Sequence, residues 1–157
     1  MDEGDDDDGE AILAMLAGAR PRTDPETAER AVRQALAAAP TDFVAQLAAY
    51  KFFFYSHRLA EALPHAQILL DQAARRLNVP LDWRAVARGD AAFDQAETAP
   101  GLYLQALIAW AYCLARLGQY ELGCEALAKA GELDPRDRFG ARRLLKVVED
   151  GPQPEED

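Results

Sequence analysis

Residues 104–137 decide the fold, and they read LQALIAWAYCLARLGQYELGCEALAKAGELDPRD. Apolar residues recur through this stretch in steps of three and four, which is the spacing of one face of an α-helix. The pattern is interrupted at Gly118 and stops before Pro135, whose ring and missing N–H prevent a helix from continuing. Two helices are therefore predicted, Leu102–Leu117 and Tyr120–Leu133, joined by a tight turn into an αα-hairpin.

The turn and the close of this hairpin resemble those of a tetratricopeptide repeat (TPR). The turn reads LGQY from Leu117, and the second helix closes with Leu-Asp-Pro from Leu133, as in the family. Small residues at Ala111, Gly123 and Ala130 would let the two helices approach closely, because side chains at the crossing set the distance between helices. The chain departs from the family pattern in placing aliphatic residues at aromatic positions and in a displaced tryptophan.

Further helices are predicted from apolar spacing, capping residues and prolines. They cover Ala11–Arg20, Pro25–Ala39, Phe43–His57, Pro64–Leu77 and Arg138–Val148. The third and fourth of these form a second hairpin of TPR-like size, with a turn in residues 58–63 that lacks a glycine. The last resembles the polar cap that closes a helical solenoid. We therefore expect an all-α, TPR-like solenoid of about three repeats with a C-terminal capping helix, spanning residues 10–150.

Residues 78–101 do not fit the repeat pattern. Val79-Pro80 breaks the preceding helix, and two short helices are predicted, Trp83–Arg88, which Gly89 ends, and Ala91–Glu97, which stops before Pro100. Because a stretch with two large aromatic residues is a poor linker, we expect an insertion between the hairpins that packs across one side of the stack.

The net charge of −10 is concentrated in the ends of the sequence. Residues 1–10 contain seven acids and residues 149–157 contain five, which leaves 15 acids in the middle against 17 lysines and arginines. Residues 1–9 are predicted to be a disordered acidic arm and residues 151–157 an acidic tail. The arm solubilises the protein or, in the alternative interpretation, binds a basic partner or calcium. The sequence contains no basic cluster of the size that nucleic-acid binding needs.

Length and composition set the class of protein. A chain of 157 residues is expected to be one domain with its own core. No apolar run reaches the roughly 20 residues of a membrane span, and the acidic N-terminus is unlike a secretory signal peptide. The two cysteines, Cys113 and Cys124, are expected to be free thiols, so the predicted location is the cytoplasm.

The candidate chemical groups favour a protein that is not an enzyme. His57 and His65 could join the two cysteines as zinc ligands, but no pair has the spacing of a structural zinc site. The sequence contains no phosphate-binding loop, nucleophile elbow or paired metal-binding carboxylates. Acidic residues on helix surfaces remain available for acid–base work, and nothing distinguishes them from ordinary solvated charges. We therefore expect no catalytic residues, no metal and no cofactor.

The TPR resemblance implies a binding groove lined by the first helix of each hairpin. Transferred to this chain, the groove-facing positions predict a partner-binding site formed by Lys51, Phe54, Tyr55, Gln105, Tyr112 and Arg116. Aromatic residues with one cation on each helix suit a peptide that has an apolar anchor and an acid. In the alternative interpretation, Phe54 and Ile108 belong to the core and the insertion fills the groove.

The predicted function is a protein-interaction module, an adaptor or assembly factor that binds a protein or peptide partner. A first alternative is a chaperone, because small acidic type III secretion chaperones have a similar length and about three repeats. A second is an accessory role in nitrogen fixation. The segments that begin at Leu81 and Gly101, LDWR and GLYL, resemble small TPR proteins encoded near bacterial nitrogen-fixation genes. A helical enzyme is the last alternative, and the oligomeric state is left open.

Overall fold

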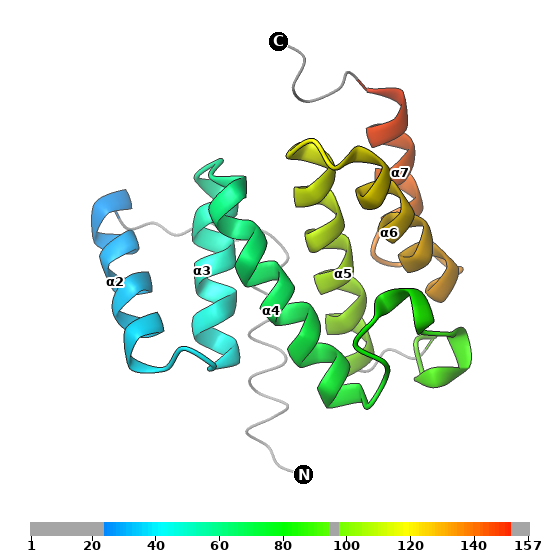
Figure 1. Ribbon diagram of the computed structural model, residues 1–157, viewed down its shortest axis with the longest axis horizontal. Helices are drawn as coiled ribbons and strands as arrows, with labels where there is room; N and C mark the ends of the chain where they lie inside the picture. The colour runs from blue at the N-terminus through cyan, green and yellow to red at the C-terminus, as the bar shows by residue number, and fades with distance from the viewer. Residues whose placement is uncertain (1–23, 95–97, 152–157) are drawn as a thin grey trace.

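The computed structural model describes residues 24–94 and 98–151 (Figure 1). Within these residues the chain has six α-helices and no strands, so the predicted all-α class is confirmed. The helices are α2 (Pro25–Ala38), α3 (Phe43–Tyr55), α4 (Leu59–Leu77), α5 (Thr98–Arg116), α6 (Tyr120–Leu133) and α7 (Ala141–Asp150). The predicted helix Ala11–Arg20, the acidic arm and residues 152–157 of the tail lie outside the described residues.

Consecutive helices pack against each other, from α2 at one end of the molecule to α7 at the other (Figure 1). Helices α3 and α4 form one antiparallel pair, α5 and α6 form the next, and α4 packs on α5 to join the two pairs. One continuous core of buried apolar side chains runs through α3, α4, α5 and α6. The end helices contribute one buried residue each, Val32 from α2 and Ala141 from α7.

The hairpin of α5 and α6 forms as predicted, with a close approach at Gly123. A β-carbon at this position would lie 2.6 Å from the Ala111 carbonyl oxygen and 2.8 Å from the Ala115 β-carbon. Only glycine fits there without displacing backbone, and the small residues on α5 complete the contact. The prediction that Gly123 lies where two helices meet is confirmed.

The start of α4 differs from the prediction. The helix begins at Leu59, so Pro64 lies in its interior and the predicted turn in residues 58–63 is wrong. The Arg58 carbonyl already accepts the amide of Ala62, and Ala62 is fully buried against the core. Pro64 lacks the N–H that would bond the carbonyl one turn earlier, so one helical bond is missing. The helix nevertheless continues through Pro64, with Ala62 and Ala66 buried on either side of it.

The starts of α5 and α7 also differ from the prediction. Helix α5 begins at Thr98 and not at Leu102, because Pro100 sits in the first turn, where its missing N–H has no partner to lose. Helix α7 begins at Ala141 and not at Arg138, and it ends at Asp150 instead of Val148. The delay has a local cause, because Gly140 is left-handed with φ of 80° and interrupts the chain before the first turn.

Smaller differences occur at the ends of two other helices. Helix α2 ends at Ala38, one residue before the predicted Ala39. Helix α3 ends at Tyr55 instead of His57, because His57 adopts a left-handed φ of 62°.

Residues 78–94 pack on the second hairpin through aromatic side chains. The Trp83 ring meets Trp110 of α5 edge to face at 5.9 Å, and Phe93 lies 5.9 Å from the Tyr103 ring. Trp83 belongs to a short 3-10 helix, η1 (Trp83–Ala85), which contacts α6.

The short elements of this segment are not the predicted α-helices. Gly89 does not end a helix after Arg88, since it lies inside a second 3-10 helix, η2 (Arg88–Asp90). Residues 91–94 form turns instead of the predicted start of Ala91–Glu97, and residues 95–97 lie outside the described part. None of the described helices has the length and apolar character needed to cross a bilayer.

Candidate partner-binding site

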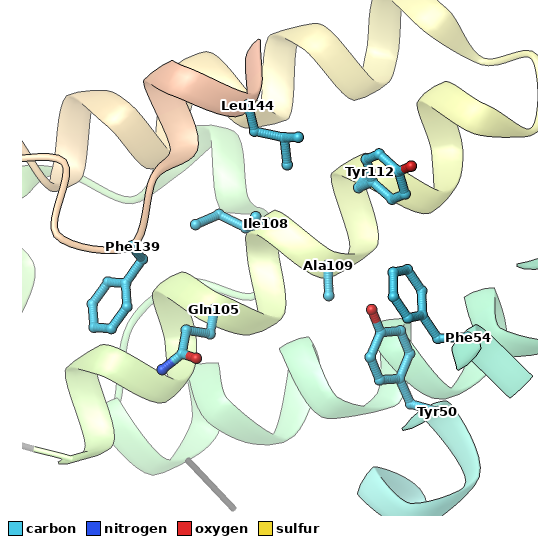
Figure 2. A pocket seen from close by; sticks show the side chains of 8 residues that line it. All are labelled: Tyr50, Phe54, Gln105, Ile108, Ala109, Tyr112, Phe139 and Leu144. Carbon is cyan, nitrogen blue, oxygen red and sulfur yellow. The ribbon is translucent and has the colours of Figure 1, made fainter. Parts of the chain in front are cut away.

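A pocket of about 380 Å³ opens between α3, α5 and the start of α7 (Figure 2). Its described lining consists of aromatic and aliphatic side chains with three polar tips. These residues are Tyr50, Phe54, Gln105, Ile108, Ala109, Tyr112, Phe139 and Leu144. The volume lies near the lower end of the range typical of ligand pockets, and apolar linings with a few polar groups are characteristic of them.

Helix α3 places two aromatic rings on one wall. Tyr50 and Phe54 are one helical turn apart, so they stack on each other with ring centroids 5.5 Å apart. The Phe54 ring then meets Tyr112 of α5 edge to face at 6.0 Å, which joins the α3 wall to α5 (Figure 2). Tyr50 is buried, and this burial raises the pKa of its phenol well above the usual value, so the hydroxyl stays protonated.

Helix α5 provides the floor of the pocket. Gln105, Ile108, Ala109 and Tyr112 are spaced by three and four residues, so they lie on one face. All four are half-buried, whereas the other residues of the helix between 100 and 115 are buried. This stripe is therefore the side of α5 that the other described helices leave uncovered.

The third wall comes from the start of α7. The Phe139 ring packs on the first turn of α5, where a β-carbon on Gly101 would lie 3.1 Å from its tip. The guanidinium of Arg138 lies 5.3 Å from the centre of the same ring. Leu144, one helical turn into α7, adds an aliphatic side chain. The absence of a side chain at Gly101 thus allows Phe139 to close this end of the pocket.

Three of the six predicted site residues line this pocket and three do not. Phe54, Gln105 and Tyr112 are brought together. Lys51 is only 5% exposed, with its ammonium 5.4 Å from the centre of the Tyr55 ring, and burial lowers the pKa of its ammonium. Neither Lys51 nor Tyr55 lines the pocket, and Arg116 lies exposed one turn beyond Tyr112.

Sequence reasoning missed part of the lining. Tyr50 could have been found from its spacing of four residues to Phe54, because both then lie on one helix face. Phe139 and Leu144 were assigned to a capping helix, and no local signal indicated that this helix also borders the groove. In the alternative interpretation the insertion fills the groove, yet no described residue of 78–94 lines the pocket.

The charged residues of α3 and α5, the two helices on either side of the pocket, are all positive. Helices α3 and α5 contain no aspartate or glutamate, and their charged residues are Lys51 and Arg116. A second pocket of about 350 Å³ shares Phe139 and Leu144 with the first and is also lined by Arg143. Arg116 and Arg143 form no ion pair with any described residue. The site therefore presents an apolar floor between two exposed guanidinium groups.

The described residues contain no group of three or more His, Cys, Asp or Glu side chains placed to hold a metal ion. His65 contacts Gln46 at 2.7 Å and stacks on Phe53, and Cys113 is fully buried, which raises its pKa to about 12. Among the described residues, the pocket lining carries hydroxyl and amide groups but no acid, histidine or thiol. Its groups are suited to non-covalent recognition of an apolar side chain.

Comparison with known proteins identifies a relative. The chain is 38% identical over 125 residues to an uncharacterized 19.8 kDa protein in the nifW 5′ region of Azotobacter chroococcum mcd 1. The aligned part covers 78% of this chain and 70% of the relative. The chain belongs to the family of that Azotobacter protein. No family model matches the chain, and no solved structure matches it.

Proposed function

We propose that this protein is a non-catalytic, TPR-like adaptor or assembly factor that binds a segment of a partner protein in the pocket between α3, α5 and α7. The observation that carries the proposal is the half-buried stripe on α5. Four side chains on an otherwise buried helix border an open apolar pocket instead of another helix. Exposed apolar surface of this kind, rimmed by polar groups, is typical of protein-interaction sites.

The two hairpins support the repeat interpretation because their turns have similar backbone conformations. His57 and Gly118 are both left-handed, with φ of 62° and 101°. The following residues, Arg58 and Gln119, have similar dihedral angles, with φ of −107° and −93° and ψ of 68° and 62°. Each donates its amide to the carbonyl five residues earlier. The same turn therefore recurs at equivalent positions of two helical pairs, as a repeat requires.

The position of the pocket also supports the proposal. It lies between α3 and α5, which are the first helices of the two hairpins, and the next first helix in that series is α7. In stacked helical repeats the first helices line a concave binding surface. A partner segment with an apolar anchor would bury that side chain against Ile108 and Leu144, and its acidic groups would meet Arg116 or Arg143.

Photo-crosslinking tests the proposed function. A photoreactive residue at Gln105, inside the pocket, should crosslink to a partner in the native host. The double variant Tyr112→Ala with Arg116→Ala should weaken capture of that partner about thirtyfold or more, since tyrosine and arginine dominate many interfaces. A matched control is Leu81→Ala with Arg88→Ala, two exposed residues outside the pocket. Equal capture by both double variants, at equal thermal stability, would contradict the proposal.

A second candidate follows from the relative, whose name places it in the nifW 5′ region. We propose that the partner belongs to a bacterial nitrogen-fixation system, which agrees with the resemblance of the LDWR and GLYL segments. Deleting the gene should slow growth on N₂ but not on ammonium. Recovery of partly unfolded client proteins in the crosslinked material would instead favour the chaperone alternative.

A further inference from the structure

We propose that the chain's own residues 11–16, AILAML, occupy the pocket in the absence of a partner. The proposal rests on the proposed function, because it takes the pocket to be a binding surface, and it adds a regulatory step in which the partner displaces this segment.

The described chain begins near the end of α3 that contributes Phe54 to the pocket. Asp24 caps the start of α2, where its carboxylate accepts the amide of Thr27. One turn later, Glu29 pairs at 2.9 Å with Arg58, which directly precedes α4. Phe54, which lines the pocket, belongs to α3 and comes four residues before Arg58. The residues that precede Asp24 therefore enter at the end of α3 that borders the pocket.

The length of the preceding sequence is sufficient. Seven residues separate Leu16 from Asp24. With residues 17–20 in the predicted helix at about 1.5 Å per residue and the rest extended at about 3.3 Å per residue, this connection spans about 19 Å. The pocket lies on the adjoining face of α5, and a helix with its side chains is about 10–12 Å across. This length exceeds the width of one helix, so it allows residues 11–16 to cross the end of α3 toward the pocket.

The chemistry of residues 11–16 matches the lining. Four of the six are large and apolar, namely Ile12, Leu13, Met15 and Leu16. The lining offers aliphatic and aromatic contacts along the stripe of α5 and on both neighbouring walls. Burial of such side chains against this surface removes apolar area from water on both sides of the contact.

Charge adds to the fit of the segment. Residues 1–10 contain seven acids, whereas α3 and α5 contain none. Arg143 adjoins the far side of the pocket, beyond Leu144, and forms no ion pair with a described residue. Residues 17–23 lead back to Asp24 at the α3 end of the pocket. With residues 11–16 in the pocket, the acidic run therefore lies toward Arg143 at the α7 end. The attraction between the acidic run and the Arg143 guanidinium is screened by salt.

Methyl NMR on the full chain tests this inference. The sequence contains two methionines, Met1 and Met15, so selective methyl labelling gives one reporter in the segment and one internal reference. Met15 is expected to show nuclear Overhauser contacts to the Phe54 or Tyr112 ring and an upfield shift relative to Met1, because a methyl group over an aromatic face is shielded. Ile108→Asp should abolish both signals, and Leu81→Asp, at an exposed position outside the pocket, should preserve them.

A second variant guards against loss of folding. Leu13→Asp changes only the segment and should move the Met15 methyl to the Met1 position while shifting the Ile108 and Ala109 methyl signals. Met15 at the Met1 position in the unmodified chain, without ring contacts, would overturn the inference. Contacts found only between labelled and unlabelled chains would also overturn it, since they place the segment on a second copy. Met15 contacts without any crosslinked partner would contradict the proposed function alone.

Discussion

The two hairpins of this molecule form similar helical pairs by different chemistry. In α5–α6 the helices meet through Gly123, and backbone lies against backbone. In α3–α4 the contact includes a ring pair, since Phe53 of α3 stacks on His65 of α4 at 5.7 Å. The turn of α3–α4 is held by Arg58, whose guanidinium pairs with Glu29 and Glu61. Helix pairing therefore depends on complementary surfaces, and a close approach at small residues is one way to form such a surface.

Removing a central ring should break the aromatic hairpin first. Phe53 is 2% exposed and also lies beneath the Arg58 guanidinium, 4.9 Å from the ring centre. Phe53→Ala should lower the free energy of unfolding by about 3–5 kcal/mol, because it leaves a large cavity. Urea titration measures the change. Val44→Ala on the same helix is the control, since Val44 is 39% exposed and should cost little.

Adding a side chain should break the glycine hairpin. Gly123→Leu is expected to cost about 3 kcal/mol, the upper part of the usual range for overpacking, because even its β-carbon meets the backbone of α5. The matched control is Gly89→Ala, since no atom lies within 4 Å of a β-carbon there. Equal midpoints in a denaturant titration for the two variants would mean that α5 and α6 separate easily and that the close approach adds little.

The two turns sharpen the comparison further. Gly118→Ala should cost about 1 kcal/mol, because a β-carbon is strained at φ of 101°. His57→Gly removes the same kind of strain at φ of 62° but adds chain entropy to the unfolded state, so we expect a change within about 0.5 kcal/mol. The melting temperatures of the Gly118→Ala and His57→Gly variants, each compared with the unmodified protein, test this difference. A larger loss in His57→Gly would show that the imidazole itself stabilises the turn.

The ion pairs at the aromatic turn predict a dependence on pH. The Arg58 guanidinium, and after it that of Arg33, lowers the pKa of Glu29 to about 2 from its usual 4.5. A lowered carboxylate pKa stabilises the fold above pH 4.5, and that stability is lost as the pH falls toward 2. Glu29→Gln should therefore be less stable than the unmodified protein at pH 7, and the difference should shrink below pH 4.5. Glu26→Gln, exposed on the same helix, should show a much smaller difference.

The same contrast explains which features could be predicted from sequence. Helix α6 has the predicted bounds because Gly118 and Pro135 mark its two ends. The start of α4 was mispredicted because the stabilisation comes from distant partners, such as Glu29 for Arg58, that no local pattern contains. The sequence pattern places Pro64 at the start of a helix, yet the structure has it in the helix interior, where one hydrogen bond is missing.

The candidate site was predicted in part for a related reason. The prediction applied the same TPR groove positions to α3 and to α5. This assumes that the same face of each helix borders the groove. The pocket lies between α3 and α5, so α3 contributes Tyr50 and the predicted Phe54, whereas the predicted Lys51 and Tyr55 do not line it. On α5 the transferred positions Gln105 and Tyr112 do line it. Which flank faces a neighbour depends on helix packing angles, and these are not encoded in local spacing.

The packing of each helix on its neighbours in the chain has a consequence for how the molecule loses structure. Apart from the contact of α6 with η1, the main contacts join consecutive helices, so each helix depends on the one before and the one after it. In such a nearest-neighbour row, opening begins at the ends and cooperativity is greatest in the middle. Amide hydrogen exchange should therefore be slowest where α4 meets α5 and fastest in α2 and α7. Because α7 also forms one wall of the pocket, local opening at that end would change the pocket long before the core unfolds.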